Sequence, residues 1–262
     1  MEPATLTISI VQADVYWEDT PRNLAHFDTL LQQVPAEANC VVLPEMFSTA
    51  FSANARALAE PMDGSTLTWV RKWAKTLNAL IAGSFIVCEK GKYYNRGFAI
   101  LPDGREYFYD KHHLFIGGEK ASFEQGGKRP QFEYLGWQIS MVICYDLRFP
   151  VFMRNTKKNP YDLMLVVAEW PKNRQYILDH LAVARAIENQ AYLCMCNRIG
   201  EDGNMLTYSG GSCLIDFKGK VKVRCTDDTE EICTYSIDKY PLESHREKAP
   251  VWRDADDFEL DL

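Results

Sequence analysis

The chain has 262 residues, of which 47% are hydrophobic, so it is long enough to bury a full core. Its formal net charge of −7 and the scatter of its Lys and Arg residues argue against a nucleic-acid partner. The first residues lack the pattern of a signal peptide, and no apolar run approaches the roughly 18 residues of a membrane helix, so we expect no membrane association.

Eight cysteines are present, and most lie in apolar, strand-like segments, where free Cys behaves as a small hydrophobic residue. No CxxC pair indicates a zinc site, and we expect no metal or other cofactor. This cysteine usage predicts a reducing, cytoplasmic compartment.

Strand-like apolar runs alternate with helical patterns along the chain. Predicted helices begin at Asp19-Thr20-Pro21 and at Ser65, and a third covers residues 173–190. Predicted strands cover residues 5–12, 40–43, 80–87, 94–101, 138–143, 162–167 and 191–197, and further strands continue to about residue 238. With no repeat and no evident linker, we expect a single α/β domain over residues 1–262, with helices covering a sheet-rich core.

The last segment, residues 245–262, is acidic and irregular in pattern. One interpretation is a frayed, solvated tail. The alternative is that its apolar residues anchor it on a partner subunit at a dimer interface. Those residues are Pro250, Val251, Trp252, Phe258 and Leu260.

Cys144 differs from the other cysteines in its position at the end of a predicted strand. It follows QISMVI directly and precedes YDLRFP, which must leave the sheet. A nucleophile on such a turn presents its side chain above the sheet, beside backbone N–H groups that can stabilise an oxyanion. Taken alone, Cys144 could equally be an inert packing residue.

Two charged residues occupy comparable positions. Glu45 ends CVVLPE, where a partly desolvated carboxylate can act as a general base, although an ordinary polar loop residue would look the same. Lys111 lies in YFYDKHHLF and is able either to turn its ammonium to water or to hold it beside a thiolate or oxyanion. The adjacent His112 and His113 would also allow a Cys–His hydrolase, which is the less favoured interpretation.

Glu119 lies in a Gly-flanked loop, GGEKASFEQG, eight residues after Lys111. Two interpretations are open. Glu119 either positions Lys111 or the leaving amine, or it is a charged loop residue that faces solvent. Glu124 in the same loop is a competing choice.

Three segments in order resemble the signature segments of the nitrilase superfamily of carbon–nitrogen hydrolases. They are LPEMF at 43–47, KHHLF at 111–115 and CYDLRFP at 144–150. Each short motif is weak alone, but together they are specific, and supporting matches extend over nearly the whole chain. These matches include ISIVQADVYWEDTPRNL, YNRGFAIL, GEKASFEQG, HLAVARAIENQAYL and the GSCLIDFKGK run near residue 215.

The resemblance implies roles for individual residues. Glu45 corresponds to the general base, Lys111 to the oxyanion-stabilising lysine, Cys144 to the nucleophile and Glu119 to an additional glutamate that helps to hold the site. It also implies a four-layer α-β-β-α sandwich, a homodimer, a small-molecule substrate and catalysis without a cofactor.

The segments PEMFSTAF, AEWP and ARAIENQAY look most like the ω-amidase branch, which hydrolyses the terminal amide of 2-oxoglutaramate and 2-oxosuccinamate. The chain departs from that branch at Glu169, where Asn is expected before Trp-Pro. Strand alternation predicts that Trp170 faces the pocket and that Glu169 points away.

Such substrates carry a distal carboxylate, so the pocket needs a cation. Arg174 is the first candidate and Arg198 the second. Apolar walls are expected from four aromatic residues, namely Phe47, Phe115, Tyr145 and Trp170.

Three other classes of function remain as alternatives. The first is a related amidase acting on N-carbamoyl amines or nitriles, and the second is a non-catalytic binding relative, which retention of Glu45, Lys111 and Cys144 disfavours. The third is a redox-sensing thiol protein, which would need a second cysteine poised to resolve Cys144, and the sequence offers no obvious one.

Overall fold

The computed structural model describes residues 5–256, 258–260 and 262. Their strands form two six-stranded sheets and a small β10–β11 pair (Ile199–Glu201 and Thr207–Ser209). The first sheet has the order β14 (Glu231–Asp238), β1 (Thr5–Gln12), β2 (Cys40–Val42), β3 (Leu80–Glu89), β4 (Lys92–Ile100) and β5 (Glu106–Asp110). The second has the order β13 (Val221–Arg224), β12 (Cys213–Ile215), β9 (Tyr192–Asn197), β8 (Leu163–Ala168), β7 (Trp137–Ile143) and β6 (Gln131–Tyr134).

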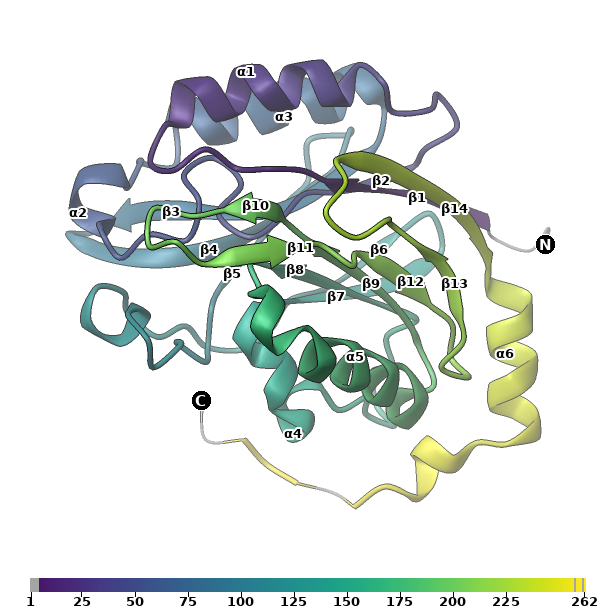
Figure 1. Ribbon diagram of the computed structural model, residues 1–262. Coiled ribbons are helices and arrows are strands. Elements are labelled where there is room, and N and C mark those ends of the chain that lie inside the picture. The colour runs from purple at the N-terminus through teal and green to yellow at the C-terminus, as the bar shows by residue number, and fades with distance from the viewer. Residues whose placement is uncertain (1–4, 257, 261) are drawn as a thin grey trace.

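Helices cover the outer face of each sheet, as Figure 1 shows. Helices α1 (Thr20–Leu31) and α3 (Ser65–Leu77) lie over the first sheet, and α4 (Pro150–Met153) and α5 (Gln175–Asn189) lie over the second. The short α2 (Ala55–Leu58) lies at one end of the first sheet, and α6 (Lys239–Lys248) follows β14 at the other. The predicted four-layer α-β-β-α sandwich is confirmed.

Local sequence explains the first outer layer. Asp19 caps α1 by accepting a hydrogen bond from the Arg22 N–H, and proline occupies the first turn, as predicted. The buried stripe of α3 includes Trp69 and Trp73, whose indole N–H groups donate to Asp28 Oδ1 at 2.8 and 2.6 Å. These two bonds join α3 to α1 while the rings pack on the sheet.

The main core lies between the two sheets. Alternate residues of β1 and of β7 and β8 point into it, including Ile8, Ile10, Met141, Ile143 and Leu165, each at most 1% exposed. Burial on both faces explains why β2, β7 and β8 have almost continuous apolar sequences. It also leaves the ends of these strands as the places where polar side chains can emerge.

The structure corrects the expectation for the end of the chain, which is not irregular from residue 245. Helix α6 continues to Lys248, and a turn of 3-10 helix covers Val251–Asp254. Arg246 is buried and donates from Nη1 to Asp162 Oδ1 at 2.8 Å, which anchors α6 to the second sheet.

Beyond that turn, Phe258 and Leu260 line a hollow together with Val151 and Phe152 of α4 of the same chain. The side chain of Trp252, one of the expected anchors, lies outside the described residues. Among those that are described, no helix combines the length and the apolar character needed to cross a membrane.

Candidate active site

The polar candidates meet at the ends of strands from both sheets. Glu45 follows β2 and Lys111 follows β5 in the first sheet, whereas Cys144 follows β7 in the second. Because the sheets pack face to face, these strand ends come together and enclose the side chains between them. Glu45 and Lys111 are at most 1% exposed, and Cys144 is 8% exposed.

Lys111 holds two carboxylates together. Its Nζ lies 2.8 Å from Glu45 Oε1 and 2.8 Å from Glu119 Oε2. The amide of Asn95 on β4 donates from Nδ2 to Glu45 Oε1 at 2.7 Å and to Glu119 Oε1 at 3.0 Å. The predicted grouping of Glu45, Lys111 and Glu119 is therefore present, whereas Glu124 is half-exposed and pairs with Lys92 at 3.4 Å.

Burial and neighbouring charges shift the pKa values of Lys111 and Glu119 in opposite directions. Burial lowers the pKa of Lys111, but the carboxylates of Glu119 and Glu45 outweigh it and hold that pKa above its usual value. For Glu119, burial and the charge of Glu45 raise the pKa more than Lys111 lowers it. Lys111 is therefore a fixed cation.

Cys144 lies on a sharp turn between β7 and the 3-10 helix Cys144–Arg148. Its φ of 43° is in the left-handed region, which a non-glycine residue adopts at a cost of about 1–3 kcal/mol. The Asp146 carboxylate holds the turn by accepting from Ile143 N–H at 3.0 Å and Tyr109 O–H at 2.8 Å. The turn predicted for Cys144 is thus observed.

The thiol is surrounded by groups that favour its protonated form. Sγ donates towards the backbone carbonyl of Glu169 at 3.8 Å. Burial raises the pKa of Cys144 well above its usual value, Glu45 adds to the effect, and Lys111 opposes it. A nucleophilic reaction at Sγ would therefore need to transfer the thiol proton as it proceeds, and Glu45 is an available acceptor.

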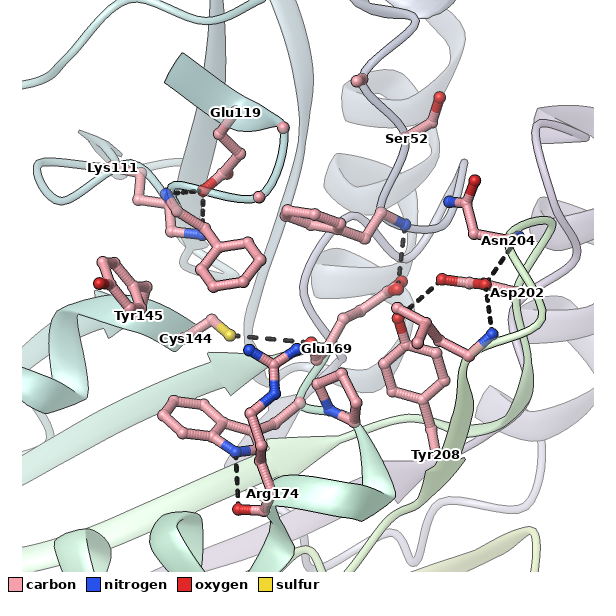
Figure 2. Close-up of a pocket in the computed structure, with 18 of the residues that line it drawn as sticks. Ser52, Lys111, Glu119, Cys144, Tyr145, Glu169, Arg174, Asp202, Asn204 and Tyr208 are labelled. Carbon is pink, nitrogen blue, oxygen red and sulfur yellow. Dashed lines mark hydrogen bonds and ion pairs between the residues drawn. The ribbon is translucent and has the colours of Figure 1, made fainter. Parts of the chain in front are cut away.

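A cavity, open to solvent at its mouth, reaches Cys144, Lys111 and Glu119 (Figure 2). Of the predicted wall residues, Phe115, Tyr145, Trp170 and Arg174 line it. The other aromatic and polar wall residues were not predicted from the sequence, and they are Phe51, Ser52, Arg148, Glu169, Asp202, Asn204 and Tyr208.

Two arginines lie over aromatic rings of the wall. The Arg174 guanidinium carbon is 5.1 Å from the Phe115 ring centroid, and that of Arg148 is 4.9 Å from the Trp170 ring centroid. Within the described residues, neither guanidinium forms an ion pair with a carboxylate. Both charges are therefore available to an anionic ligand.

Arg198, the second predicted cation, does not line the cavity. It is fully buried and donates from Nη2 to Asp14 Oδ1 at 2.6 Å and to the carbonyl of Val15 at 2.9 Å. These contacts tie the connection between β9 and β10 to the segment that follows β1.

The prediction that Phe47 forms a pocket wall is wrong. Its ring is fully buried between the first sheet and its helices, with centroids 5.2 Å from Phe27 and 5.5 Å from Trp69. The cause is the turn after Glu45, where Met46 has a φ of 42° and its N–H donates to Ser84 Oγ at 2.8 Å. This turn directs the following side chain to the outer face of the sheet.

Both Glu169 and Trp170 contribute to the cavity wall, but the Glu169 side chain is buried and its Oε2 lies 3.5 Å from Nη1 of Arg198, which does not line the cavity. Strand β8 ends at Ala168, so side-chain alternation no longer applies at the next two residues. The Glu169 N–H donates to Glu45 Oε2 at 2.9 Å, and its side chain turns towards the loop of Phe51.

The histidines do not support a Cys–His arrangement. Among the described residues that line the cavity there is no histidine. His113 Nδ1 lies 2.8 Å from Asp146 Oδ1 and its ring stacks on Phe149, while His112 Nδ1 lies 2.7 Å from the carbonyl of Gly126. Of the eight cysteines, Cys144 lines the described cavity wall and the other seven do not, so no resolving thiol is in place.

Comparisons with known proteins agree with this geometry. The carbon-nitrogen hydrolase family model matches residues 7–246. The Omega-amidase YafV of Escherichia coli (strain K12) is 40% identical over 97% of this chain and 98% of its own length. The 2-oxoglutaramate amidase of Bacillus subtilis (strain 168) is 32% identical over 98% of both chains.

Among solved structures, XC1258 from Xanthomonas campestris is a CN-hydrolase superfamily protein with an arsenic adduct in its active site. It superposes with a TM-score of 0.95 at 40% identity, over 99% of this chain and 100% of that one. Saccharomyces cerevisiae Nit3, of the nitrilase superfamily, has the same fold, with a TM-score of 0.84 at 23% identity, covering 95% of each chain. Fold, site geometry and full-length similarity together place this chain in the carbon–nitrogen hydrolase family.

Proposed function

We propose that the chain is an ω-amidase. It hydrolyses the terminal amide of short 2-oxo dicarboxylic acid monoamides, such as 2-oxoglutaramate and 2-oxosuccinamate, and releases ammonia through a thioester on Cys144. The observation that carries the proposal is a small cavity that holds Cys144, Lys111 and Glu119 and whose wall holds two arginines with no carboxylate partner among the described residues. Relatives named as an omega-amidase and a 2-oxoglutaramate amidase support it.

In this mechanism Cys144 Sγ attacks the amide carbonyl while Glu45 takes the thiol proton. Lys111 and the backbone N–H of Tyr145 stabilise the oxyanion, an effect worth about 3–4 kcal/mol per donor. The tetrahedral intermediate breaks its C–N bond, and Glu45 returns the proton to the departing ammonia. Glu45 then activates a water molecule that hydrolyses the thioester to the dicarboxylate and frees the thiol.

Glu119 acts as a positioning residue. It does not need to exchange protons with the substrate, because its carboxylate already holds Lys111 Nζ at 2.8 Å and accepts the backbone N–H of Phe115 at 2.7 Å. These two contacts fix both the lysine and the loop that carries one aromatic wall. Phe115, Tyr145 and Trp170 enclose the carbon chain of the substrate.

A panel of purified-enzyme assays tests the proposed substrate class. Ammonia release is measured with 2-oxoglutaramate, 2-oxosuccinamate, an aliphatic nitrile and an N-carbamoyl amine under the same conditions. We expect the two 2-oxo amides to give the highest kcat/KM. A higher value for the nitrile or the N-carbamoyl amine would assign the chain to a different activity of the same fold.

Arg174 is proposed to bind the substrate carboxylate. Arg174→Ala is expected to raise KM for 2-oxoglutaramate by about ten- to a hundredfold, because a charged hydrogen bond is worth about 1.5–3 kcal/mol. KM for a neutral short amide should change much less. Steady-state kinetics with both substrates provide the measurement.

The control for this variant is Arg224→Ala, which removes a half-buried arginine that pairs with Asp179 at 3.1 Å and does not line the cavity. It should leave both KM values unchanged. Equal KM values for Arg174→Ala and the parent enzyme would place the carboxylate elsewhere, with Arg148 the next candidate.

We further propose that residues 1–262 act as one domain in a cytoplasmic homodimer, with the C-terminal tail near the interface. Support comes from α5, whose outer face exposes Tyr176 at 74% and Ile187 at 48%. Light scattering on the purified protein should give twice the mass of the chain, and the mass of a single chain would contradict a dimer.

A further inference from the structure

Two thiols and a carboxylate meet outside the cavity and have no role in the mechanism above. Cys225 follows β13, and Glu231 and Cys233 lie on β14. The two Sγ atoms and one carboxylate oxygen all lie within 4.8 Å of one another. None of these three residues lines the described wall of the cavity, so the cluster is separate from the site of hydrolysis.

The approach of the two sheets brings this cluster together. Strand β13 is at the edge of the second sheet and β14 is at the edge of the first, and Figure 1 shows them side by side. Glu231 and Cys233 are two residues apart on β14 and therefore share one face of it. Cys233 lies opposite Ile10, whose side chain is in the core between the sheets, so this face is directed towards the second sheet and Cys225. No CxxC spacing announces such a cluster.

The carboxylate of the cluster lacks a basic partner. Three other acidic residues of the same loop each pair with a basic side chain at 2.7–3.4 Å, namely Asp227, Asp228 and Glu230. Within the part of the chain that the structure describes, Glu231 has no such pair, and its Oε1 accepts the backbone N–H of Thr226. A carboxylate has lone pairs for further contacts, so Glu231 is able to accept a cation beside the two thiols.

The surroundings of the thiols favour a bound cation over oxidation. Burial raises the pKa of Cys225 and of Cys233, and the charge of Glu231 adds to both shifts. Thiols of this kind form little thiolate and react slowly with oxidants. A metal ion reverses the balance, because it deprotonates a coordinating thiol and is attracted by the carboxylate.

The cluster is also open enough for an ion to enter. Cys225 is 1% exposed, whereas Cys233 and Glu231 are half-buried and reach the surface. An ion can therefore approach from the side of β14, and water can occupy a remaining coordination position.

We propose that Cys225, Glu231 and Cys233 form a binding site for a divalent thiophilic ion, with zinc as the ion that this ligand set fits. Two thiolates and a carboxylate oxygen supply three ligands of a tetrahedron, and water supplies the fourth. Binding of Zn²⁺ breaks both S–H bonds, forms two Zn–S bonds and releases two protons to solvent, without a change of oxidation state. The ion fastens the edges of the two sheets to each other and takes no part in hydrolysis.

Zinc binding by the full chain tests the proposal. The experiment uses reduced, metal-free protein carrying Cys144→Ala, so that the thiol in the cavity cannot bind the metal. Titration calorimetry with zinc should give about one site per chain. Cobalt(II) added in its place should give the charge-transfer absorption of thiolate ligands.

Variants in the same background assign the ligands. Cys225→Ser and Cys233→Ser should each weaken zinc binding by about a hundredfold or more, and Glu231→Gln should weaken it by about tenfold. Cys88→Ser is the matched control, because this half-buried thiol on β3 is outside the cluster, and it should bind zinc as the background protein does. Zinc should also raise the Tm of the background protein and of Cys88→Ser, but not that of Cys233→Ser.

Unchanged zinc affinity in Cys233→Ser and Glu231→Gln would overturn the proposal. These two half-buried positions decide the question if Cys225→Ser does not fold. Failure of the reduced protein to bind zinc would also contradict it. A disulfide between Cys225 and Cys233, detected by mass spectrometry after removal of the reductant, would in that case assign the pair to redox chemistry instead.

Discussion

Replacing Cys144 by serine is expected to abolish hydrolysis and to leave the fold intact. The two side chains are close in size, but a hydroxyl group is far less acidic and less nucleophilic than a thiol. The surroundings of Sγ already disfavour its ionised form, so the proton transfer to Glu45 becomes still harder with oxygen. We expect kcat to fall by about a thousandfold or more.

The measurement is ammonia release from 2-oxoglutaramate, with circular dichroism and thermal unfolding as tests of folding. Cys144→Ala should behave in the same way. Cys233→Ser provides a matched control, because this half-buried thiol on β14 does not line the cavity. Activity of Cys144→Ser within about tenfold of the parent would exclude Cys144 as the nucleophile.

Replacing Glu45 or Lys111 is expected to lower kcat about as much as replacing Cys144. Glu45→Gln removes the proton acceptor, and Lys111→Met removes the cation that stabilises the oxyanion, so each should lower kcat by about a thousandfold or more. The double variant should lose much less than the product of the two factors, because both groups act on one transition state.

The three variants are compared with the parent by steady-state kinetics, together with thermal unfolding. Lys111→Met leaves Glu45 and Glu119 buried without their cation, so a lower stability is expected and must be separated from lost activity. His113→Ala serves as the contrasting variant. If it abolished turnover while Glu45→Gln remained active, a Cys–His mechanism would replace the one proposed.

The fold and the central cluster could be predicted because local patterns determine them. Apolar runs identify the strands, and Glu45, Lys111 and Cys144 each follow the end of one. Polar side chains at the ends of buried strands have few places to go except a shared edge, so their sequence positions predict their proximity.

The directions of side chains just beyond a strand end could not be predicted. The prediction for Phe47 failed because a turn, set by the contact of Met46 with Ser84, replaces strand alternation at that position. Arg148 was not predicted as a wall residue for a different reason. Nothing in the sequence distinguishes it from the other arginines, and its place at the cavity depends on the packing of its guanidinium over the Trp170 ring. Asn95 lies in the YNRGFAIL segment, which resembles the family. Its hydrogen bonds to Glu45 and Glu119 could not be predicted, because these residues are 50 and 24 positions away in the sequence.

The comparison of 2-oxoglutaramate with glutamine tests the ω-amidase assignment most directly. The two molecules differ in the 2-oxo group and the ammonium group, and the ammonium would enter a cavity that holds Lys111, Arg148 and Arg174. An unpaired charge in such a place costs several kcal/mol, so kcat/KM for 2-oxoglutaramate should be about a hundredfold or more above that for glutamine. Equal values for the two amides would contradict the assignment.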